Sequence, residues 1–205
     1  MTSHRENLVA DESREQLVAR LRESGRWMLR FSNNGRSYNG GFQWSPLGEW
    51  TEAPDWNPKP VCGGGLHGQG PGGFGDSPTT GSHLDLCETE ELVVIGGKVK
   101  TPRARIVAHD NVAIEIAQDL CGGKWPGGLD CSGYAHDLPS LTHVGGSLDC
   151  EGYAHALLSL SHVGGDLYCK GYAYDLPSLS HVGGWLDCKG YAHEAELRKR
   201  IGDKP

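Results

Sequence analysis

One short stretch of the chain concentrates residue types that can do chemistry. Cys62 and His67 are the first and last residues of the run C-G-G-G-L-H, so a thiol and an imidazole flank glycines that let a bound molecule approach the backbone closely. Basic side chains that could bind an anion follow downstream, and an imidazole near such groups can bind or cleave a phosphoester or a nucleotide. The candidate catalytic residues are therefore His67 and Lys98, and the candidate ligand-binding residues are Gly65, Leu66, Arg103 and Arg105.

The same residues allow two other interpretations. Cys62 and His67 could simply hold the loop in one conformation. With His83 and Cys87 they also give the spacing C-x4-H and H-x3-C, which zinc ligands can have, although a long loop separates the two halves. We therefore favour no metal site, keep these four residues as the metal candidates, and predict no cofactor.

The glycines that follow fit a phosphate-binding motif only formally. Residues 68–73 read G-x-G-x-x-G, but no clear strand precedes them, no helix follows, and Pro71 removes one of the amides that a phosphate would use. The sequence motifs of the common hydrolases and nucleoside triphosphatases do not occur either. The run therefore does not favour dinucleotide binding of this type, and chemistry must be sought around His67.

The residues before this loop predict a helix and a hairpin. The capping-box spacing S-R-E-Q, the apolar residues that follow on one helical face and the stop signal Gly25 predict a helix over residues 13–24. The runs WMLRF and YNGGFQW flank Asn-Asn-Gly-Arg, and Asn-Gly is the strongest short hairpin signal. We therefore expect residues 27–31 to pair with residues 38–44.

The residues after the loop predict short strands. LVVI at 92–95 and ARIVA at 104–108 are typical of strands, while VAIEIAQDL at 112–120 could form a strand or a helix. With 31 glycines and 11 prolines, the composition favours short strands and loops over helical bundles. We therefore expect an N-terminal helix within residues 1–26 and a small α+β domain over residues 27–121.

The rest of the chain repeats itself every 19 residues. The four units begin PGGLDC, GGSLDC, GGDLYC and GGWLDC, and leucine and cysteine lie two residues apart in each, which is strand alternation with both side chains pointing inward. Repeats near this length form stacked units that bury their apolar faces against their neighbours. The predicted fold class is therefore mainly β: the α+β domain, then a short β-solenoid of four repeats over residues 126–191, then a charged helical cap over residues 192–205.

Columns of cysteine and histidine recur in the repeat and allow two interpretations. The columns are Cys131, Cys150, Cys169 and Cys188; His136, His155 and His193, interrupted by Tyr174; and His143, His162 and His181. Stacked thiols or imidazoles could bind a metal. Inward cysteines beside leucines are more simply small buried hydrophobes, and a tyrosine in a histidine column shows that a flat polar ring is enough there. We therefore expect structural ladders in all three columns.

The charge balance limits the partners of the repeat. The chain has a formal net charge of −7, and the repeats carry two lysines against seven acidic residues. Such a surface repels phosphates, so the repeat is not expected to bind nucleic acid, and we expect a protein partner. No run approaches the roughly 20 apolar residues of a membrane span, and the polar, acidic start has no apolar signal region. We therefore expect no membrane association and a cytoplasmic location.

The order of these features resembles a group of uncharacterised phage and prophage proteins. The layout GGFQW, then C-G-G-G-L-H, then G-K-V ahead of L-P-S-L-x-x-V-G-G repeats is similar to proteins that join a small domain with a C-x-x-G-[FL]-H motif to tandem L-P-x-L-x-x-V-G-G repeats. The resemblance spans most of residues 27–191. It implies a phage-related origin without a known activity, and it points to Cys62, Gly65, Leu66, His67 and Lys98. The glycine-dense run after His67 departs from the pattern.

Two functions of different class follow. The first, which we favour, is a phage-related accessory protein of an infected or lysogenic bacterial cell, whose repeats present a rigid surface to a protein partner. The alternative is a nucleotide- or NAD-using enzyme, for ADP-ribosyl transfer or nucleotide cleavage, centred on His67. A concave pocket shared by His67, Lys98 and Arg105 would favour the enzyme, and a buried His67 bonded only to backbone would disfavour it.

Overall fold

The computed structural model describes residues 12–33, 35–37, 41–74, 83–130, 141–151, 157–170, 176–190 and 194–202. The chain divides into two units, residues 1–120 and 121–205, which are described separately below. Strands predominate over the three helices of the described part, as in a small α+β protein, so the expectation of a mainly β fold is confirmed at this level. In that part of the chain, no helix combines the length and the apolar character that a membrane span requires.

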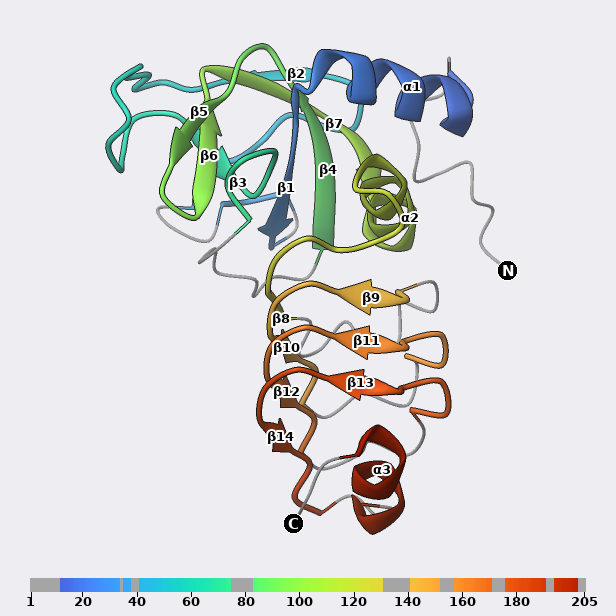
Figure 1. Cartoon of the computed structure of the whole chain (residues 1–205). Helices are drawn as coiled ribbons and strands as arrows, with labels where there is room; N and C mark the ends of the chain where they lie inside the picture. Colours follow the sequence, from blue (N-terminus) through green and yellow to red (C-terminus); the bar gives the residue numbers. More distant parts are fainter. Residues whose placement is uncertain are drawn as a thin grey trace. The chain divides into compact units, whose positions relative to one another are not determined.

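A four-stranded antiparallel sheet organises the first unit (Figure 1). In spatial order its strands are β1 (Trp27–Ser32), β4 (His83–Thr89), β7 (Arg103–His109) and β2 (Trp50–Glu52). All six residues of β1 are buried, and this strand pairs with β4 along its whole length. The predicted strand ARIVA is confirmed as part of β7.

A second sheet, of three strands, carries part of the loop that holds Cys62 and His67. Its antiparallel order is β3 (Leu66–Gly68), β6 (Lys98–Thr101) and β5 (Val93–Ile95). Gly96, with a φ of +58°, allows the tight turn between β5 and β6. His67 lies opposite Lys100 in the register of β3 and β6. The predicted strand LVVI is confirmed as β5.

Two helices belong to the first unit. The predicted helix is confirmed as α1 (Arg14–Ser24), with the capping box between Ser13 and Gln16 and a left-handed Gly25 at its end. The ambiguous segment forms a helix, α2 (Asp110–Leu120), since its buried residues fall on one helical face. Helix α2 packs against β4 and β7, and α1 packs against α2.

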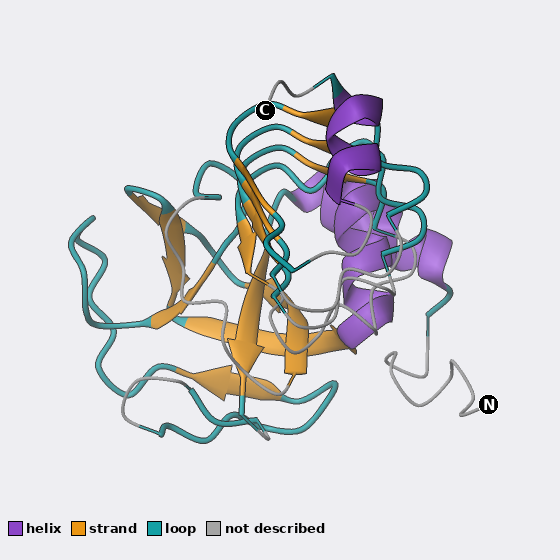
Figure 2. Cartoon of the chain, turned by 90° about the horizontal axis from the view of Figure 1, so that it is seen from below, coloured by secondary structure: helices purple, strands orange, loops and turns teal. Residues whose placement is uncertain are grey.

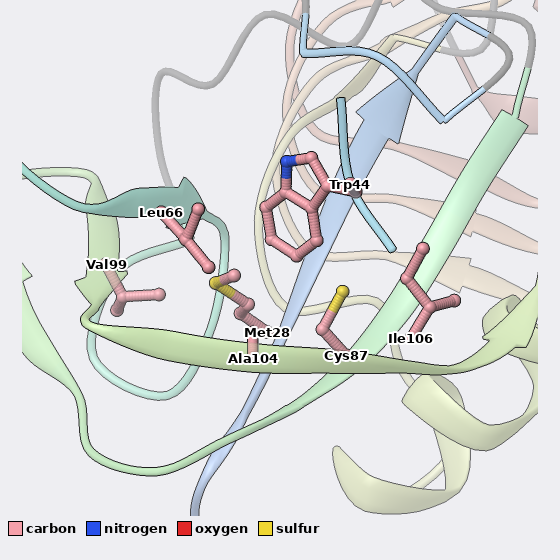
Figure 3. Packing of buried hydrophobic residues seen from close by; sticks show 7 residues of the cluster. All are labelled: Met28, Trp44, Leu66, Cys87, Val99, Ala104 and Ile106. Atoms are coloured by element: carbon pink, nitrogen blue, oxygen red, sulfur yellow. The ribbon is translucent and has the colours of Figure 1, made fainter. Parts of the chain in front are cut away.

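Figure 3 shows a cluster of seven buried side chains in the first unit. They come from β1, β3, β4, β6 and β7 and from the segment before β2: Met28, Leu66, Cys87, Val99, Ala104, Ile106 and Trp44. None of them is more than 4% exposed. Burying a large apolar side chain contributes about 1.5–3 kcal/mol, so this cluster is a major part of what holds the two sheets together.

The predicted pairing of residues 27–31 with residues 38–44 is wrong. Asn33 and Arg36 do close a turn, through two backbone hydrogen bonds of 3.0 Å. However, β1 pairs with β4 and not with the residues after the turn, part of which lie outside the described residues. A partner strand that matches β1 over six residues stabilises it more than a short local pairing does.

Two parallel ladders with a 19-residue register run through the second unit. One contains β8 (Leu129–Asp130), β10 (Leu148–Asp149), β12 (Leu167–Tyr168) and β14 (Leu186–Asp187); the other contains β9 (His143–Val144), β11 (His162–Val163) and β13 (His181–Val182). Figure 1 shows the strands in these two rows, and Figure 2 shows the loops of successive repeats following the same curve. Each repeat therefore bonds to its equivalent in the next repeat.

The columns expected to point inward are buried wherever the structure describes them. At most 2% of the surface is exposed for Leu129, Leu148, Leu167, Leu186, Cys150, Cys169 and Cys188. The three cysteines are free thiols. The second histidine column is stacked, with ring centroids 4.1 Å apart for His143 and His162 and 4.2 Å apart for His162 and His181. Outside the described residues lie Cys131 and the whole column of His136, His155, Tyr174 and His193.

Helix α3 (Glu194–Ile201) follows the last strands of the second unit (Figure 1). Its Leu197 is 1% exposed. Arg198 donates a hydrogen bond of 3.1 Å to the carbonyl oxygen of Leu186, and Arg200 donates one of 3.2 Å to that of Pro177. The bond from Arg198 reaches a carbonyl group of β14, the last strand of its ladder, whose edge would otherwise lack a partner there.

Candidate functional site

A cavity of about 390 Å³ lies in the first unit beside the loop that carries Cys62 and His67. Its wall includes Arg30 and Phe31 from β1, Phe42 and Asp55 from loops, Lys98 from β6, and the whole run Cys62–His67. This volume is within the usual range of small-molecule sites, about 300–1,000 Å³. The cavity brings together five residues that the sequence singled out: Cys62, Gly65, Leu66, His67 and Lys98.

Lys98 and Cys62 form the reactive pair at the mouth of this site. The Lys98 ammonium donates a hydrogen bond of 3.3 Å from Nζ to the Cys62 Sγ. Lys98 begins β6, and the register of β6 with β3 places its backbone beyond Gly68. It is therefore the long side chain that reaches the loop before β3. Cys62 is exposed and carries a free thiol. A thiol, an ammonium group and solvent access thus coincide at one point of the cavity wall.

Lys100 forms hydrogen bonds to the backbone of this loop. Its side chain is fully buried, and its Nζ donates hydrogen bonds of 2.9 Å to the Val61 carbonyl oxygen and 3.0 Å to that of Gly63. The same ammonium lies 5.6 Å from the ring centroid of Trp56, which adds a cation–π contact. A buried ammonium group is stable only with such partners. Lys100 therefore fixes the loop on which Cys62 stands.

The glycines of the loop make a close approach to the preceding chain segment possible. Gly64 has a φ of +62°, and a Cβ there would lie 2.7 Å from the carbonyl oxygen of Asp55. The backbone N–H of Gly65 donates a hydrogen bond of 3.1 Å to the Asp55 carboxylate. The C-G-G-G-L-H run is thus folded tightly against residues 55–57, and its three glycines add no side chain that could cover Cys62.

The charges of the site change the protonation of both reactive groups. The hydrogen bond from Lys98 is the main cause that lowers the pKa of the Cys62 thiol, and the charge of Lys98 and the backbone N–H of Gly63 lower it further. Burial is the main cause that lowers the pKa of His67, and the charges of Lys98 and Lys100 add to it against the opposing charge of Asp55. Relative to free side chains, the site therefore shifts Cys62 toward its thiolate form and His67 toward its neutral form.

His67 keeps hydrogen-bonding capacity for a bound molecule. Its Nδ1 is buried and makes no hydrogen bond to any group that the structure describes. The imidazole lines the cavity and is only partly buried. His67 is therefore not a histidine bonded only to backbone, which was the observation that would have counted against a chemical role.

Arg30 is a cation of the cavity that the sequence did not single out. It is 5% exposed, stacks over the Trp44 ring at 3.8 Å from the centroid, and lies 3.6 Å from the Asp85 carboxylate through its Nη1. Neither terminal nitrogen has a hydrogen-bond partner among the described residues. Burial lowers the pKa of this guanidinium, against the opposing charge of Asp85. A buried guanidinium with unused donors can bind an anion strongly.

Arg103 and Arg105 do not line this cavity, so the structure does not bring them together with His67 and Lys98. Arg105 Nε donates a hydrogen bond of 2.7 Å to Glu88, and Arg103 Nε lies 3.7 Å from Glu52. Both guanidinium groups also lie near the ring of Trp50, on β2 beside β7. Both residues stand on β7 and not on the small sheet, which places them away from the wall of this cavity.

The four metal candidates do not form a metal site either. Cys87 is buried in the apolar cluster of Figure 3. His83 hydrogen-bonds to Asp110 at 3.1 Å through Nδ1 and lines a different cavity, of about 380 Å³. Of the four, only Cys62 and His67 share a cavity. Within the described ranges, no group of three or more His, Cys, Asp or Glu side chains is arranged to hold a metal ion.

Sequence reasoning missed three charged residues of the site, and a signal existed for one of them. Lys98 and Lys100 are two apart on a strand, which predicts that both side chains leave it on the same side. Arg30 has no such signal, since it stands on β1, far from the loop in the sequence. Asp55 is close to the loop in the sequence, but no motif marks it.

Comparison with known proteins adds no relative from which a role could be transferred. The chain matches no protein-family model. It matches no curated protein, and no solved structure matches it. The function is therefore inferred from the residues of this chain alone.

Proposed function

We propose that the first unit binds an anionic small molecule, of the nucleotide class, in the cavity around His67. The observation that carries this proposal is the convergence of Arg30 and Lys98 on a cavity where Asp55 is the one acidic side chain among the described residues of the wall. Two cationic side chains therefore face one acidic side chain on this wall.

The state of Arg30 supports an anion as the missing partner. The carboxylate that pairs with it, Asp85, is also hydrogen-bonded to His109 at 2.8 Å, so one carboxylate has two side-chain partners. Removing a guanidinium from water is costly unless hydrogen bonds replace the lost solvent. A phosphate or carboxylate in the cavity would accept bonds from the unused terminal nitrogens.

The apolar part of the wall suits the rest of a nucleotide. Phe31 and Phe42 line the same cavity as the two cations. Aromatic rings present flat apolar faces on which a base can stack, while cations bind the phosphate. Small-molecule sites typically combine such apolar walls with a few well-placed polar groups. The cavity is therefore amphipathic in the way that a nucleotide requires.

His67 and Lys98 give this site the means for chemistry on such a ligand. A neutral imidazole near pH 7 can accept a proton, and an ammonium group can stabilise negative charge as it develops. On this basis we keep the proposal of an enzyme that uses nucleotides or NAD, for nucleotide cleavage or ADP-ribosyl transfer. His67 is its proposed base and Lys98 its proposed charge-stabilising group.

Calorimetric titration tests the binding step with AMP and adenosine as probes. We expect AMP to bind saturably and adenosine to bind at least about tenfold more weakly, which corresponds to about 1.4 kcal/mol. Arg30→Met and Lys98→Met should each weaken AMP binding by a similar factor, because each removes one cation from the wall. Arg26→Met removes an exposed arginine just before β1 and should leave the affinity unchanged. Equal affinity for AMP and adenosine would overturn the proposal.

For the second unit we propose a short β-solenoid of four 19-residue repeats, capped by α3, that binds a protein partner. Support for the solenoid comes from the two parallel ladders and from the buried leucine and cysteine columns. Support for a partner comes from two large apolar side chains that face solvent in the second unit, Trp185 at 69% and Leu158 at 51% exposure. Tryptophan is enriched among residues that dominate binding energies. The proposed setting is a phage-related accessory role in the cytoplasm of a bacterial cell.

Substitution of the exposed apolar residues tests this second role. A partner is first isolated with the full chain as bait, and its affinity is then measured with both proteins purified. We expect Trp185→Ser and Leu158→Ser to weaken binding by at least about tenfold, in line with the loss of a dominant interface residue. Val94→Ser removes an exposed apolar residue of the first unit, 46% exposed, and is the matched control. Unchanged affinity in both repeat variants would refute the assignment.

A further inference from the structure

We propose that Cys62 is a nucleophile that accepts an acyl group from an activated acyl compound with an anionic leaving group, with Lys98 as its cationic partner and His67 as a base. This deepens the proposed function, because it rests on the same cavity and on its preference for anions. The sequence pointed to His67 and Lys98 as catalytic, whereas it considered Cys62 only as a metal ligand or a lock of the loop. The geometry instead points to Cys62 as the nucleophile, with Lys98 and His67 as the groups that assist it.

The surroundings of Cys62 are those of a stabilised thiolate. Its sulfur accepts a hydrogen bond from the Lys98 ammonium at 3.3 Å, and the backbone N–H of Gly63 supports the same negative charge. The thiolate is the nucleophilic form of cysteine, and cations and backbone N–H groups beside it increase its population. The other described cysteines are buried or half-buried. Burial raises the pKa of Cys87, Cys169 and Cys188, and it raises that of Cys121 to about 11.

Two further groups of the cavity point to a ligand at this thiolate. Arg30 is only 5% exposed, and both of its terminal nitrogens lack hydrogen-bond partners in the described structure. His67 likewise lines the cavity with an unbonded Nδ1. Cys62 is therefore not an isolated cysteine: the nucleophile, a base and an anion-binding group line one cavity.

The two half-reactions balance without an oxidant or a further cofactor. In the first, the Cys62 sulfur attacks the carbonyl carbon, a C–S bond forms, and the bond from that carbon to the leaving group breaks. The leaving group departs as an anion with the electron pair of that bond, so Lys98 keeps its proton. In the second, water attacks the thioester and gives one proton to His67, and the C–S bond then breaks with its electron pair on sulfur, which restores the Cys62 thiolate. The carboxylic acid product loses its proton to solvent and leaves as a carboxylate, and His67 also returns its proton to solvent.

The charges of the cavity wall indicate that the leaving group is an anion. Arg30 and Lys98 would bind its negative charge, and the ammonium of Lys98 would also stabilise the oxyanion that forms at the carbonyl. An acyl phosphate is the simplest compound of this class, and acetyl phosphate is its smallest stable example. A neutral ester such as p-nitrophenyl acetate carries the same acetyl group without that charge, so the two probes separate acyl transfer from anion recognition.

The first experiment measures the rate of iodoacetamide alkylation at each cysteine as a function of pH, by peptide mapping of the full chain. We expect Cys62 to react first, with a half-maximal rate at a pH below 9.0, the ordinary pKa of a cysteine thiol. Lys98→Met should raise this pKa and slow labelling near neutral pH, because the rate follows the thiolate fraction, which falls about tenfold when the pKa rises by about 1. Lys98→Arg should restore most of the rate, because it keeps the positive charge.

The matched control is Lys59→Met, which removes an exposed lysine of the same segment without a described side-chain contact to Cys62. Its alkylation profile should equal that of the wild type. A profile for Cys62 that is the same in the wild type and in Lys98→Met would overturn the assignment of a stabilised thiolate, because an exposed cysteine with no partner would behave in that way.

The second experiment treats the protein with acetyl phosphate and reads the mass of the Cys62 peptide. We expect one acetyl group in the wild type and none in Cys62→Ser, and we expect Arg30→Met to lose the preference for acetyl phosphate over p-nitrophenyl acetate. If AMP binds but Cys62 gains no acetyl group from either donor, the nucleophile is refuted and the binding proposal stands. If Cys62 is acetylated while neither AMP nor acetyl phosphate is preferred over its neutral counterpart, the binding proposal fails and the nucleophile stands.

Discussion

Replacing Asp85 with asparagine is expected to lower the free energy of unfolding of the first unit by about 3–5 kcal/mol, the usual effect of breaking a buried ion pair from one side. Asp85 is 1% exposed. Its carboxylate accepts a bond of 2.8 Å from His109 and lies 3.6 Å from the guanidinium of Arg30. Asparagine keeps the shape but removes the charge, so Arg30 would remain buried without a counter-charge.

Hydrogen exchange read by mass spectrometry at peptides of β1 and β4 measures this effect within the first unit. Asp119→Asn is the matched control, since that carboxylate is 47% exposed and pairs with Arg14 at 2.8 Å. Such a surface pair contributes about 0–1 kcal/mol. The double variant of Arg30→Met and Asp85→Asn should recover part of the loss, because it removes both members of the pair. A loss below about 1 kcal/mol for Asp85→Asn would contradict the prediction.

The same variant should change the titration of His109. The hydrogen bond to Asp85 is the main cause that raises the pKa of this imidazole, against the effect of burial. The raised pKa means that the bond stabilises the folded state most at low pH and that this contribution is lost as the pH rises through the folded pKa. In Asp85→Asn the pKa of His109 should fall, which NMR titration of the imidazole detects.

Gly164→Ala is expected to destabilise the second unit by about 3 kcal/mol, at the upper end of overpacking costs. The residue lies between β11 and β12, and its N–H donates a hydrogen bond of 2.8 Å to the Val144 carbonyl oxygen of the preceding repeat. A Cβ at this position would overlap the carbonyl group of Gly145, whose carbon is 3.0 Å away. The two repeats would have to separate, which weakens the bonds of both parallel ladders.

Gly128→Ser is the matched control for this substitution. Its Cβ would lie 3.4 Å from the Ser147 carbonyl oxygen, an ordinary contact. The equivalent positions of the next repeats are Ser147, Asp166 and Trp185, so this column accepts side chains. We expect a change within about 0.5 kcal/mol for the control. Hydrogen exchange of peptides from residues 157–170 measures both variants. If Gly164→Ala and Gly128→Ser show equal protection, the close stacking of the repeats does not require a glycine at position 164.

Local patterns were reliable where a partner lies at a fixed distance along the chain. The capping box at Ser13 and the stop at Gly25 need only neighbouring residues, and both are present in α1. The leucine and cysteine columns are buried as expected, because the strand partners in the ladders lie 19 residues away in the sequence. The 19-residue period therefore identifies directly which residues pair with each other.

The site illustrates the limit of such patterns. The run C-G-G-G-L-H and Lys98 were found from their types and spacing, and they line one cavity. Arg103 and Arg105 were equally good candidates by spacing, but they stand on β7 and bond to Glu52 and Glu88. Arg30 lies far from the motif in the sequence and close to it in space.

The sequence by itself determined the helix α1, the parallel register of the repeats and the presence of a thiol and an imidazole in a glycine-rich loop. Only the tertiary structure decided which cations share the cavity with Cys62 and His67. The reason is that β1 meets the segment that follows His67, through the two backbone hydrogen bonds between Leu29 and Gln69, which are far apart in the sequence. Such a pairing is selected by total burial and by the sum of many hydrogen bonds, and no local spacing records it. Through it Arg30 reaches the loop that the sequence had already marked.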